Sequence, residues 1–292
     1  MKSSAELQNL LNEHIKDFLP DNDFKDVLLY SLIPAGKLFR PKLVHALAHD
    51  LGQLTQNHFY LASSLEVHHT YTLIHDDLPA MDNDDYRRGK LSSHKKFNEF
   101  KAILAGDALL NISFGLLSSI EHKSLNTLLK LYSEYTGAKG LILGQVLDLE
   151  NSIHSIESIL EIHTLKTARL IQLALEGSYL LTDSQIDQKI ISNLGLAIGI
   201  SFQLLDDLSE LTEDINDHEL KINPFINLNS KSLFTILNKN LDTIQQTLDE
   251  YNLNESSKIM NEYFFKMSKI IQDGEKEIQK RIQGFLFSNL KL

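Results

Sequence analysis

The 292-residue chain contains no cysteine. It therefore has no disulfides, zinc–thiolate sites, iron–sulfur clusters or cysteine nucleophile, which fits a reducing compartment. Basic residues are in the minority, since 28 Lys and Arg stand against 39 Asp and Glu, for a formal net charge of −11. A general nucleic-acid binder needs clustered bases to neutralise phosphates, so the composition argues against one. A small anionic ligand held by metal ions and a few local bases stays compatible with it.

Long apolar runs are also missing. No stretch reaches the ~18 apolar residues of a membrane span, and the longest candidate, Leu194 to Leu205, is followed by two aspartates. The N-terminal segment carries Glu6, Glu13 and Asp17 among its apolar residues, which is unlike a signal peptide. We therefore expect a soluble cytoplasmic protein without a membrane partner.

Prolines and strand signals are sparse. None of the five prolines lies between Pro79 and Pro224, so this stretch can hold long unkinked helices. Apolar residues recur there at helical spacing, and no alternating run, Asn-Gly or Asp-Gly pair predicts a sheet. The chain is predicted to be all-α and to form a single domain over residues 1–292.

The predicted helices run over about 4–18, 22–33, 37–51, 57–77, 101–120, 124–149, 156–180, 184–211, 231–250 and 255–285. Gly140 and Gly144 lie one turn apart, as do Gly195 and Gly199. Both pairs predict positions where helices pack closely.

A first acidic cluster follows an apolar segment and places five carboxylates within ten residues. Its members are Asp76, Asp77, Asp82, Asp84 and Asp85. In a cleft, such a cluster needs cations or raised pKa values, and hard cations such as Mg²⁺ share oxygen ligands with substrate phosphates. Asp76 is expected to end a helix and Pro79 to turn the chain, so that Asp82 returns towards the same ion.

A second acidic cluster ends another apolar helix. Asp206 and Glu210 are four residues apart and share one helical face, and Asp207 is placed as a neighbour or supporting partner. Two such helix ends predict a facing pair around a site for several Mg²⁺ ions and a diphosphate. An acidic run on a solvated surface is the alternative for each cluster.

Bases suited to an anion accompany the first cluster. Arg87 and Arg88 follow it, and Lys37 and Arg40 are three apart, so that they share a helix face. His69 lies seven residues before Asp76 on a similar face and could reach a second anion. An exposed first turn for Lys37 and Arg40, and a buried core position for His69, fit the same spacing.

A metal-dependent phosphohydrolase is a rival interpretation. His75-Asp76 matches the paired core of such enzymes, and His68, His69 and Asp107 are available as further ligands. This interpretation leaves the remaining acids and both arginines unexplained. A calcium loop starting at Asp82 fails, because Arg87 stands where glycine is required.

The motifs together resemble those of the trans-prenyl diphosphate synthases, and most closely the bacterial farnesyl diphosphate synthases. The matching strings are GKLFRP, HTYTLIHDDLPAMDNDDYRRG, LAGDAL, GQVLDLE, HTLKTARLI and FQLLDDLSE, in the family's order, over roughly residues 28–211. The resemblance implies an all-α bundle around a deep central cavity, usually a homodimer. It implies condensation of isopentenyl diphosphate with an allylic diphosphate, dimethylallyl or geranyl, giving mainly farnesyl diphosphate.

The resemblance also implies roles for individual residues. Metal ligands, for Mg²⁺ or alternatively Mn²⁺, would be Asp76, Asp77, Asp82, Asp206 and Glu210. Substrate diphosphates would be held by Gly36, Lys37, Arg40, His69, Arg87, Arg88 and Lys221. Lys166, Thr167 and Gln203 would line the reacting centre, and Gln145 and Asp148 match a family helix near the metal site.

Chain length in this family is limited just upstream of the first acidic motif. Tyr71 and Thr72 lie five and four residues before Asp76. The ring of Tyr71 would therefore close the bottom of the cavity and favour a C15 product. A packed core aromatic is the alternative for Tyr71.

The sequence departs from the family pattern after the second motif. Glu210 replaces the usual aspartate, the following segment is shorter, and Lys221 only weakly matches a family lysine. A non-catalytic or regulatory relative that binds diphosphates or a partner synthase is therefore the second hypothesis. Retention of Lys166, Thr167 and Gln203 favours an active enzyme.

Overall fold

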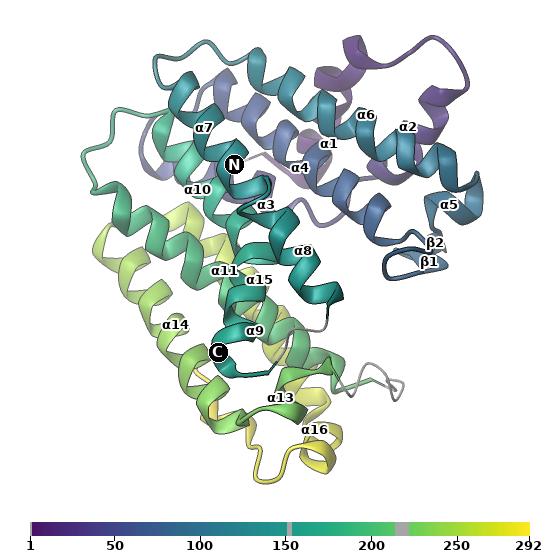
Figure 1. Ribbon diagram of the computed structural model, residues 1–292. Coiled ribbons are helices and arrows are strands. Elements are labelled where there is room, and N and C mark those ends of the chain that lie inside the picture. The colour runs from purple at the N-terminus through teal and green to yellow at the C-terminus, as the bar shows by residue number, and fades with distance from the viewer. Residues whose placement is uncertain (1, 151–153, 214–221) are drawn as a thin grey trace. The chain divides into compact units, whose positions relative to one another are not determined.

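The computed structural model describes residues 2–150, 154–213 and 222–292 (Figure 1). It has two compact units, Met1–Leu129 with Leu180–Thr182 and Lys130–Tyr179 with Asp183–Leu292. Helices dominate both units, which confirms the predicted all-α class. A single domain over residues 1–292 stays a prediction.

The first unit is built mainly on two long helices, α4 and α6, which pack side by side. The elements of this unit are α1 (Ser4–Ile15), η1 (Lys16–Phe18), α2 (Phe24–Leu32), α3 (Phe39–Asp50), α4 (Gln56–Asp76), β1 (Tyr86–Arg87), β2 (Lys90–Leu91), α5 (Ser93–Lys96), α6 (Glu99–Ser118) and the start of α7 (Leu125–Thr136). Apolar faces of α1, α2, α4 and α6 meet in one core, in which Leu32, Leu109 and Leu116 have no exposed surface.

Alpha-helix α6 is long and apolar enough to cross a membrane by length and composition alone, with a mean hydropathy of 1.5 over an 18-residue window. Ala102, Ala105 and Leu109 of this helix are buried in the core of the first unit. Of that window 44% is buried, so α6 packs one face into the core and leaves apolar residues exposed on the other.

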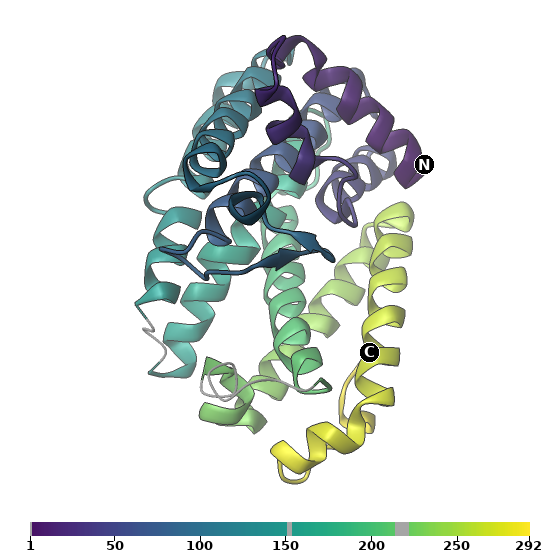
Figure 2. The same ribbon diagram turned by 90° about the vertical axis from the view of Figure 1, so that its right-hand side faces the viewer.

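A small hairpin, not predicted from the sequence, follows the first acidic motif. Strands β1 and β2 pair antiparallel, with Arg87 opposite Lys90 (Figure 2). Arg88 and Gly89 between them have φ of 54° and 74°, the left-handed values that a type I′ turn requires at both central residues. The usual Asn-Gly signal is absent because arginine occupies the first of these positions.

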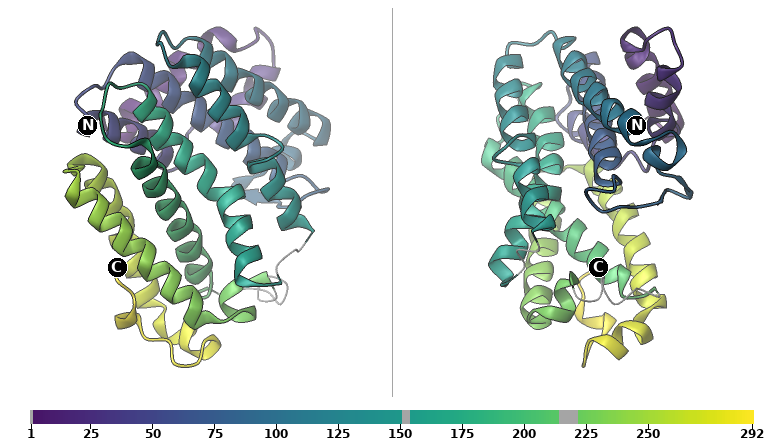
Figure 3. Two further views of the ribbon diagram at one scale, coloured as in Figure 1. Left: turned by 60° about the vertical axis from the view of Figure 1, so that its left-hand side comes forward. Right: turned by 45° about the vertical axis from the view of Figure 1, so that its right-hand side comes forward.

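The second unit continues α7 and adds α8 (Leu141–Leu149), α9 (Ile156–Ile162), the π-helical segment η2 (His163–Ala168), α10 (Arg169–Leu180), α11 (Gln188–Glu210), α13 (Pro224–Asn227), α14 (Ser230–Glu250), α15 (Asn254–Asp273), α16 (Glu275–Arg281) and η3 (Phe287–Asn289). Alpha-helices α11 and α14 run side by side (Figure 3). Their core includes Leu204, Leu208 and Leu237, none of which has exposed surface.

Two of the predicted helices are each split in the structure. The helix expected over 124–149 is α7 and α8, because the chain leaves the helix between Gly137 and Gly140. A Cβ atom on Gly140 would lie 2.1 Å from the carbonyl oxygen of Tyr135. The helix expected over 255–285 is α15 and α16, divided at Gly274.

Three of the four paired glycines mark close helix contacts, as predicted. A Cβ atom on Gly144 would lie 2.4 Å from the backbone nitrogen of Lys166, and one on Gly199 would lie 2.4 Å from Cα of Ala168. One on Gly195 would lie 2.7 Å from Cα of Gln172. Segment η2 and the start of α10 therefore touch both α8 and α11 through backbone.

Three buried histidines predict that the protein is destabilised by mild acid. Burial lowers the pKa of His45, His68 and His163 to about 3 each, whereas the unfolded side chain titrates near 6.5. Below that pH the unfolded chain binds protons that the folded chain does not. Each such histidine lowers the free energy of unfolding by about 1.4 kcal/mol per pH unit.

Urea unfolding between pH 7.5 and 5.5 measures this slope. His68→Gln should lower the slope by about one proton's worth, whereas replacing the exposed His49 by Gln serves as the matched control. An unchanged slope in the His68 variant would show that its imidazole is protonated in the folded state.

Candidate active-site residues

The first acidic motif folds back on the helix that precedes it. Helix α4 ends at Asp76, as expected, and the amide of Asp82 donates a 2.9 Å hydrogen bond to the carbonyl oxygen of Asp76. The backbones of Asp76 and Asp82 are therefore adjacent despite being six residues apart in sequence. Asp82 is exposed and Asp76 is partly exposed, so both carboxylates are accessible to an ion.

Asp77 is the buried member of this motif, with 3% of its surface exposed. Its Oδ1 atom accepts hydrogen bonds from Nε and Nη2 of Arg87, the first at 2.7 Å. Arg87 also donates to Asp84 at 2.8 Å. Burial raises the pKa of Asp77, and the guanidinium of Arg87 opposes that shift. Asp77 thus holds Arg87 in place. Its role as a metal ligand stays a prediction.

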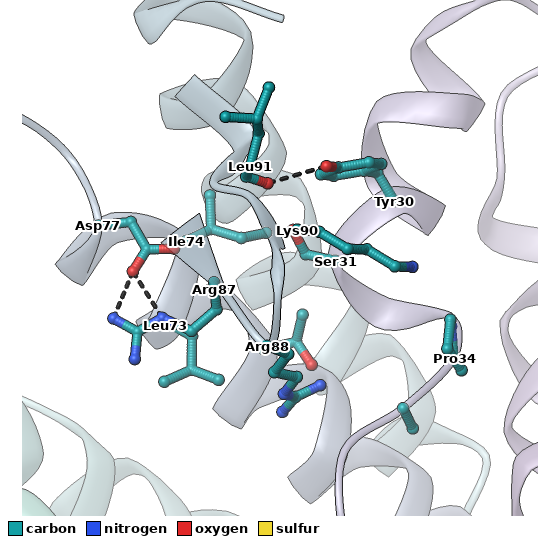
Figure 4. Close-up of a pocket in the computed structure, with 12 residues that line it drawn as sticks. Tyr30, Ser31, Pro34, Leu73, Ile74, Asp77, Arg87, Arg88, Lys90 and Leu91 are labelled. Atoms are coloured by element: carbon teal, nitrogen blue, oxygen red, sulfur yellow. Dashed lines mark hydrogen bonds and ion pairs between the residues drawn. The ribbon is translucent and has the colours of Figure 1, made fainter. Parts of the chain in front are cut away.

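A cavity of about 190 Å³ lies beside this ion pair (Figure 4). Residues of α2, α4 and the hairpin line it, among them Tyr30, Leu73, Asp77, Arg88 and Lys90. The hydroxyl of Tyr30 donates to the carbonyl oxygen of Leu91 at 2.8 Å, which ties the hairpin to α2.

A cationic group in the first unit joins residues from three segments around one buried glutamate. Glu66 of α4 is 3% exposed and accepts a hydrogen bond from the amide of Gly36. Burial raises the pKa of Glu66, whereas the charges of Arg40 and Arg88 oppose that shift. The guanidinium of Arg88 packs against Gly36, where a Cβ atom would lie 2.5 Å from Nη2.

Arg40 is a donor suited to an anion. Burial lowers its pKa to about 10, which leaves the side chain cationic at neutral pH. Its Nε atom is buried and has no hydrogen-bond partner among the residues that the structure describes. Burial also lowers the pKa of His69 well below its usual value, and Arg40 and Arg88 add to that shift, so its imidazole is neutral.

Backbone strain gathers in the same segments. Leu38, Asn83, Arg88 and Asn252 are the described non-glycine residues with left-handed φ, and the first three lie in motifs singled out from the sequence. Such conformations cost about 1–3 kcal/mol each and persist where surrounding contacts impose them. Buried Leu38 stands between Lys37 and Arg40 and turns the chain into α3.

Tyr71 and His75 pack within the first unit. Tyr71 is 6% exposed and lies edge-on to the rings of His68 and His75, at centroid distances of 4.6 and 5.7 Å. Nε2 of His75 lies 3.0 Å from the carbonyl oxygen of Ile103. A Cβ atom on Gly106 would lie 2.0 Å from that nitrogen, so His75 is seated against α6.

In the second unit, segment η2 presents its polar side chains to two neighbouring helices. Nζ of Lys166 donates to Oδ2 of Asp148 on α8. Oγ1 of Thr167 donates to Oε1 of Gln203 on α11 at 2.8 Å. The structure therefore pairs Thr167 with Gln203 and Lys166 with Asp148, through adjacent residues of η2. A π-helical turn is rare and often marks a functional site.

Asp207 and His163 form a buried pair next to these residues. They are 6% and 5% exposed, and Oδ2 of Asp207 lies 3.3 Å from Nε2 of His163. Burial raises the pKa of Asp207 well above its usual value, and the charges of Glu210, Asp206 and Asp148 raise it further, whereas a hydrogen bond from Gln203 opposes this. Burial, aided by Lys166, lowers the pKa of His163 to about 3.

Asp206 and Glu210 project from the exposed face of α11, as their spacing predicts. Asn223 fastens the end of this helix, because its Nδ2 atom donates to the carbonyl oxygen of Asp207 at 2.7 Å. Lys221 lies outside the described residues. Asp76 and Asp206 belong to different units, and their facing each other across one site stays a prediction.

Sequence reasoning overlooked two residues of these groups, Glu66 and His163. Glu66 lies three residues before His69, and His163 lies four before Thr167, so each shares a helical face with a residue that was singled out. That spacing was the available signal.

Comparisons with known proteins address the family. The sequence profile described as polyprenyl synthetase matches residues 21–263. The chain belongs to the polyprenyl synthetase family. Within that family it is 36% identical to farnesyl diphosphate synthase of Micrococcus luteus over 251 residues, which covers 83% of this chain and 85% of that protein. It is 37% identical to farnesyl diphosphate synthase of Bacillus subtilis over 213 residues, covering 70% and 72%.

Solved structures extend the likeness of this polyprenyl synthetase family member to the fold. A geranyltransferase from Legionella pneumophila superposes with a TM-score of 0.75 at 26% identity, covering 95% of this chain and 96% of that one. A geranyltranstransferase from Thermotoga maritima gives 0.72 at 27% identity, covering 92% and 97%. The resemblance deduced from the sequence motifs is thereby confirmed.

The ion pair of Asp77 and Arg87 should be important for stability. Arg87→Ala would leave a buried carboxylate with two hydrogen bonds fewer, which should lower the free energy of unfolding by about 1–3 kcal/mol. In the double variant Asp77→Ala also removes the carboxylate, so no buried charge is left unpaired. The double variant should therefore lose less free energy of unfolding than the two single variants lose in sum.

Urea denaturation of the four proteins in this double-mutant cycle measures the coupling. Lys90→Ala, which removes an exposed cation from the same hairpin, is the control. Additive effects of the two substitutions would contradict the pairing.

Proposed function

We propose that the chain is a short-chain prenyltransferase that condenses isopentenyl diphosphate with dimethylallyl or geranyl diphosphate, with farnesyl diphosphate as the main product. The observation that carries the proposal is the assembly of Lys166, Thr167 and Gln203 at segment η2, in a chain whose relatives include farnesyl diphosphate synthases.

The cationic group of the first unit is proposed to bind isopentenyl diphosphate. Arg40, Arg88 and neutral His69 lie around Glu66, and the unpartnered Nε of Arg40 can donate to a phosphate oxygen. Lys37 is exposed at the start of the same segment and can add a second charge. Gly36 leaves room for the Arg88 guanidinium, which a side chain would displace.

The allylic diphosphate is proposed to bind at the acidic motifs through Mg²⁺, with Mn²⁺ as an alternative ion. Among the described residues no group of three or more acidic or imidazole side chains forms a ready-made metal cage. Accessible carboxylates at Asp76, Asp82 and Asp206, with Glu210 one turn further, suit ions that take their remaining ligands from phosphates and water. Arg87, held by Asp77, would contact the same diphosphate.

Bound magnesium would act as a Lewis acid that stabilises the charge growing on the departing diphosphate. The side chains of the protein supply fixed charges and orientation, which need no rearrangement during the reaction. Thr167 and Gln203 would present polar oxygen atoms to the allylic carbon as it becomes positive, and the cation of Lys166 would act on the negatively charged diphosphate. Apolar walls would keep water from that carbon.

The chain is further proposed to act as a homodimer. Helix α6 exposes Phe100, Ile103 and Leu104, and α8 exposes Ile142 and Val146. Exposed apolar side chains that recur along one helix are typical of surfaces that pair with another protein.

Neither alternative activity gains support from the structure. A phosphohydrolase site would need His75 as a metal ligand, but Nε2 of His75 lies against Ile103 and Gly106. The relatives named above are farnesyl diphosphate synthases, which favours catalysis over a purely binding role.

Incubation with Mg²⁺, isopentenyl diphosphate and geranyl diphosphate tests the proposal. We expect farnesyl diphosphate, identified by chromatography and mass spectrometry. We expect Asp76→Asn and Asp206→Asn each to lower kcat/KM about ten- to a hundredfold. Glu13→Gln removes an exposed carboxylate from α1 and is the control.

Each other outcome of this assay points elsewhere. Absence of elongation at high enzyme concentration would favour the binding relative. Release of inorganic phosphate without elongation would favour the hydrolase.

Tyr71 is proposed to limit product length. Tyr71→Ala should shift the products towards C20, because the ring would no longer limit the depth of the product cavity that the family resemblance implies. Tyr60→Ala on the same helix is the control. The truncation of a buried aromatic also costs about 3–5 kcal/mol of stability, so Tyr71→Leu provides a milder variant. Product distributions unchanged in both Tyr71 variants would reject the role.

A further inference from the structure

The buried histidine of segment η2 has no part in the proposed chemistry, yet it touches the residues that do. His163 is the first residue of the π-helical segment, four before Thr167. Its Nε2 atom lies 3.3 Å from Oδ2 of Asp207 on α11. Among the described residues, neither that oxygen nor Nδ1 of His163 has a hydrogen bond of good geometry.

Asp207 is linked in turn to two residues of the proposed reacting centre. Its Oδ1 atom accepts a 2.9 Å hydrogen bond from Nε2 of Gln203. Oε1 at the other end of the Gln203 amide accepts from Oγ1 of Thr167 at 2.8 Å. His163, Asp207, Gln203 and Thr167 therefore form a continuous chain of contacts that begins and ends on η2.

We propose that His163 is a positioning residue, which fixes the carboxylate of Asp207 and thereby orients the Gln203 amide and the Thr167 hydroxyl. This inference rests on the proposed function, since it concerns residues assigned to that reaction. His163 itself touches no substrate.

The donor and acceptor roles in this series of contacts explain why the contact between His163 and Asp207 affects Gln203. The amide of Gln203 has a donor end and an acceptor end, and these face Asp207 and Thr167 respectively. A half-turn of the amide would place its oxygen against the carboxylate oxygen and its NH₂ against a hydroxyl that is donating. The amide orientation is therefore set by where Oδ1 of Asp207 points.

The position of that oxygen depends on the other half of the carboxylate. Oδ2 of Asp207 is buried, and leaving a buried carboxylate oxygen without a polar neighbour is unfavourable. With the imidazole removed, rotation of the carboxylate towards another donor would relieve this and carry Oδ1 away from Gln203. Backbone movement cannot compensate easily, because Gly199 of α11 is already in contact with Ala168 of η2.

Two substitutions at His163 separate positioning from packing. His163→Leu keeps apolar bulk but removes both ring nitrogens. His163→Gln places an amide nitrogen near the position of Nε2 and should restore the contact. The conservative change Ile162→Val, at the buried neighbouring residue, is the matched control for packing.

Steady-state kinetics with geranyl and isopentenyl diphosphate give the first readout. We expect His163→Leu to lower kcat about tenfold or more, because reacting groups tolerate little misplacement, with both KM values within twofold of wild type. His163→Gln should keep kcat within about threefold. Wild-type kcat in His163→Leu, or a Gln variant as impaired as the Leu variant, would overturn the inference.

A double-mutant cycle on stability gives a readout that needs no activity. His163→Leu and Asp207→Leu should shift the urea midpoint by less in combination than the sum of their separate shifts, because each removes the same contact. Additive shifts would overturn the inference. If His163→Leu does not fold, His163→Asn, whose shorter amide does not reach Asp207, takes its place in the cycle.

The two readouts also separate this inference from the proposed function. One outcome is that the wild-type protein folds but gives no elongation, while the variants show coupling between residues 163 and 207. It would refute the prenyltransferase assignment and leave the contact established. The other outcome is that the wild-type protein elongates normally, while the His163 variants show neither coupling with Asp207 nor a change in kcat. It would refute the role of His163 alone.

Discussion

The polar arrangement of the second unit depends on the close backbone approach of segment η2 to α8 and α11. Gly144 and Gly199 permit it, because a Cβ atom at either position would lie 2.4 Å from η2 backbone. Lys166 and Thr167 are adjacent in sequence, so they point to different neighbours, and each meets a polar partner there. The close approach lets the short side chain of Thr167 reach the amide of Gln203.

The first unit achieves its arrangement by a different means, which is strain in short connections. Leu38 and Arg88 adopt left-handed φ values that neither side chain favours. Glycine or asparagine would satisfy the turn at Arg88 more easily, but neither carries a guanidinium. The strained conformation of Arg88 persists because surrounding contacts hold its guanidinium beside Gly36 and near Glu66.

Burial of ionisable groups in both units has a common electrostatic consequence. Desolvation leaves His68, His69 and His163 neutral and raises the pKa of Glu66 and Asp207. Two cations, by contrast, are paired with carboxylates, Arg87 with Asp77 and Lys166 with Asp148.

The sequence by itself determined the all-α class, most helix positions and the motif residues. These follow from local properties: apolar residues at helical spacing, prolines that stop helices, and acidic and basic residues at fixed intervals. The helix end at Asp76 and the close contacts at Gly144, Gly195 and Gly199 could be predicted for the same reason.

Only the tertiary structure decided which partners these residues have. The break between α7 and α8, the hairpin at Arg88, the π-helical form of η2 and the places of Glu66 and His163 did not follow from the sequence pattern. The physical reason is that a periodic pattern encodes which face of a helix is buried, whereas burial and hydrogen bonding between distant segments depend on how the helices pack. Asp77 and Asp82 are both predicted metal ligands of one motif, yet Asp77 is buried against Arg87 and Asp82 is exposed.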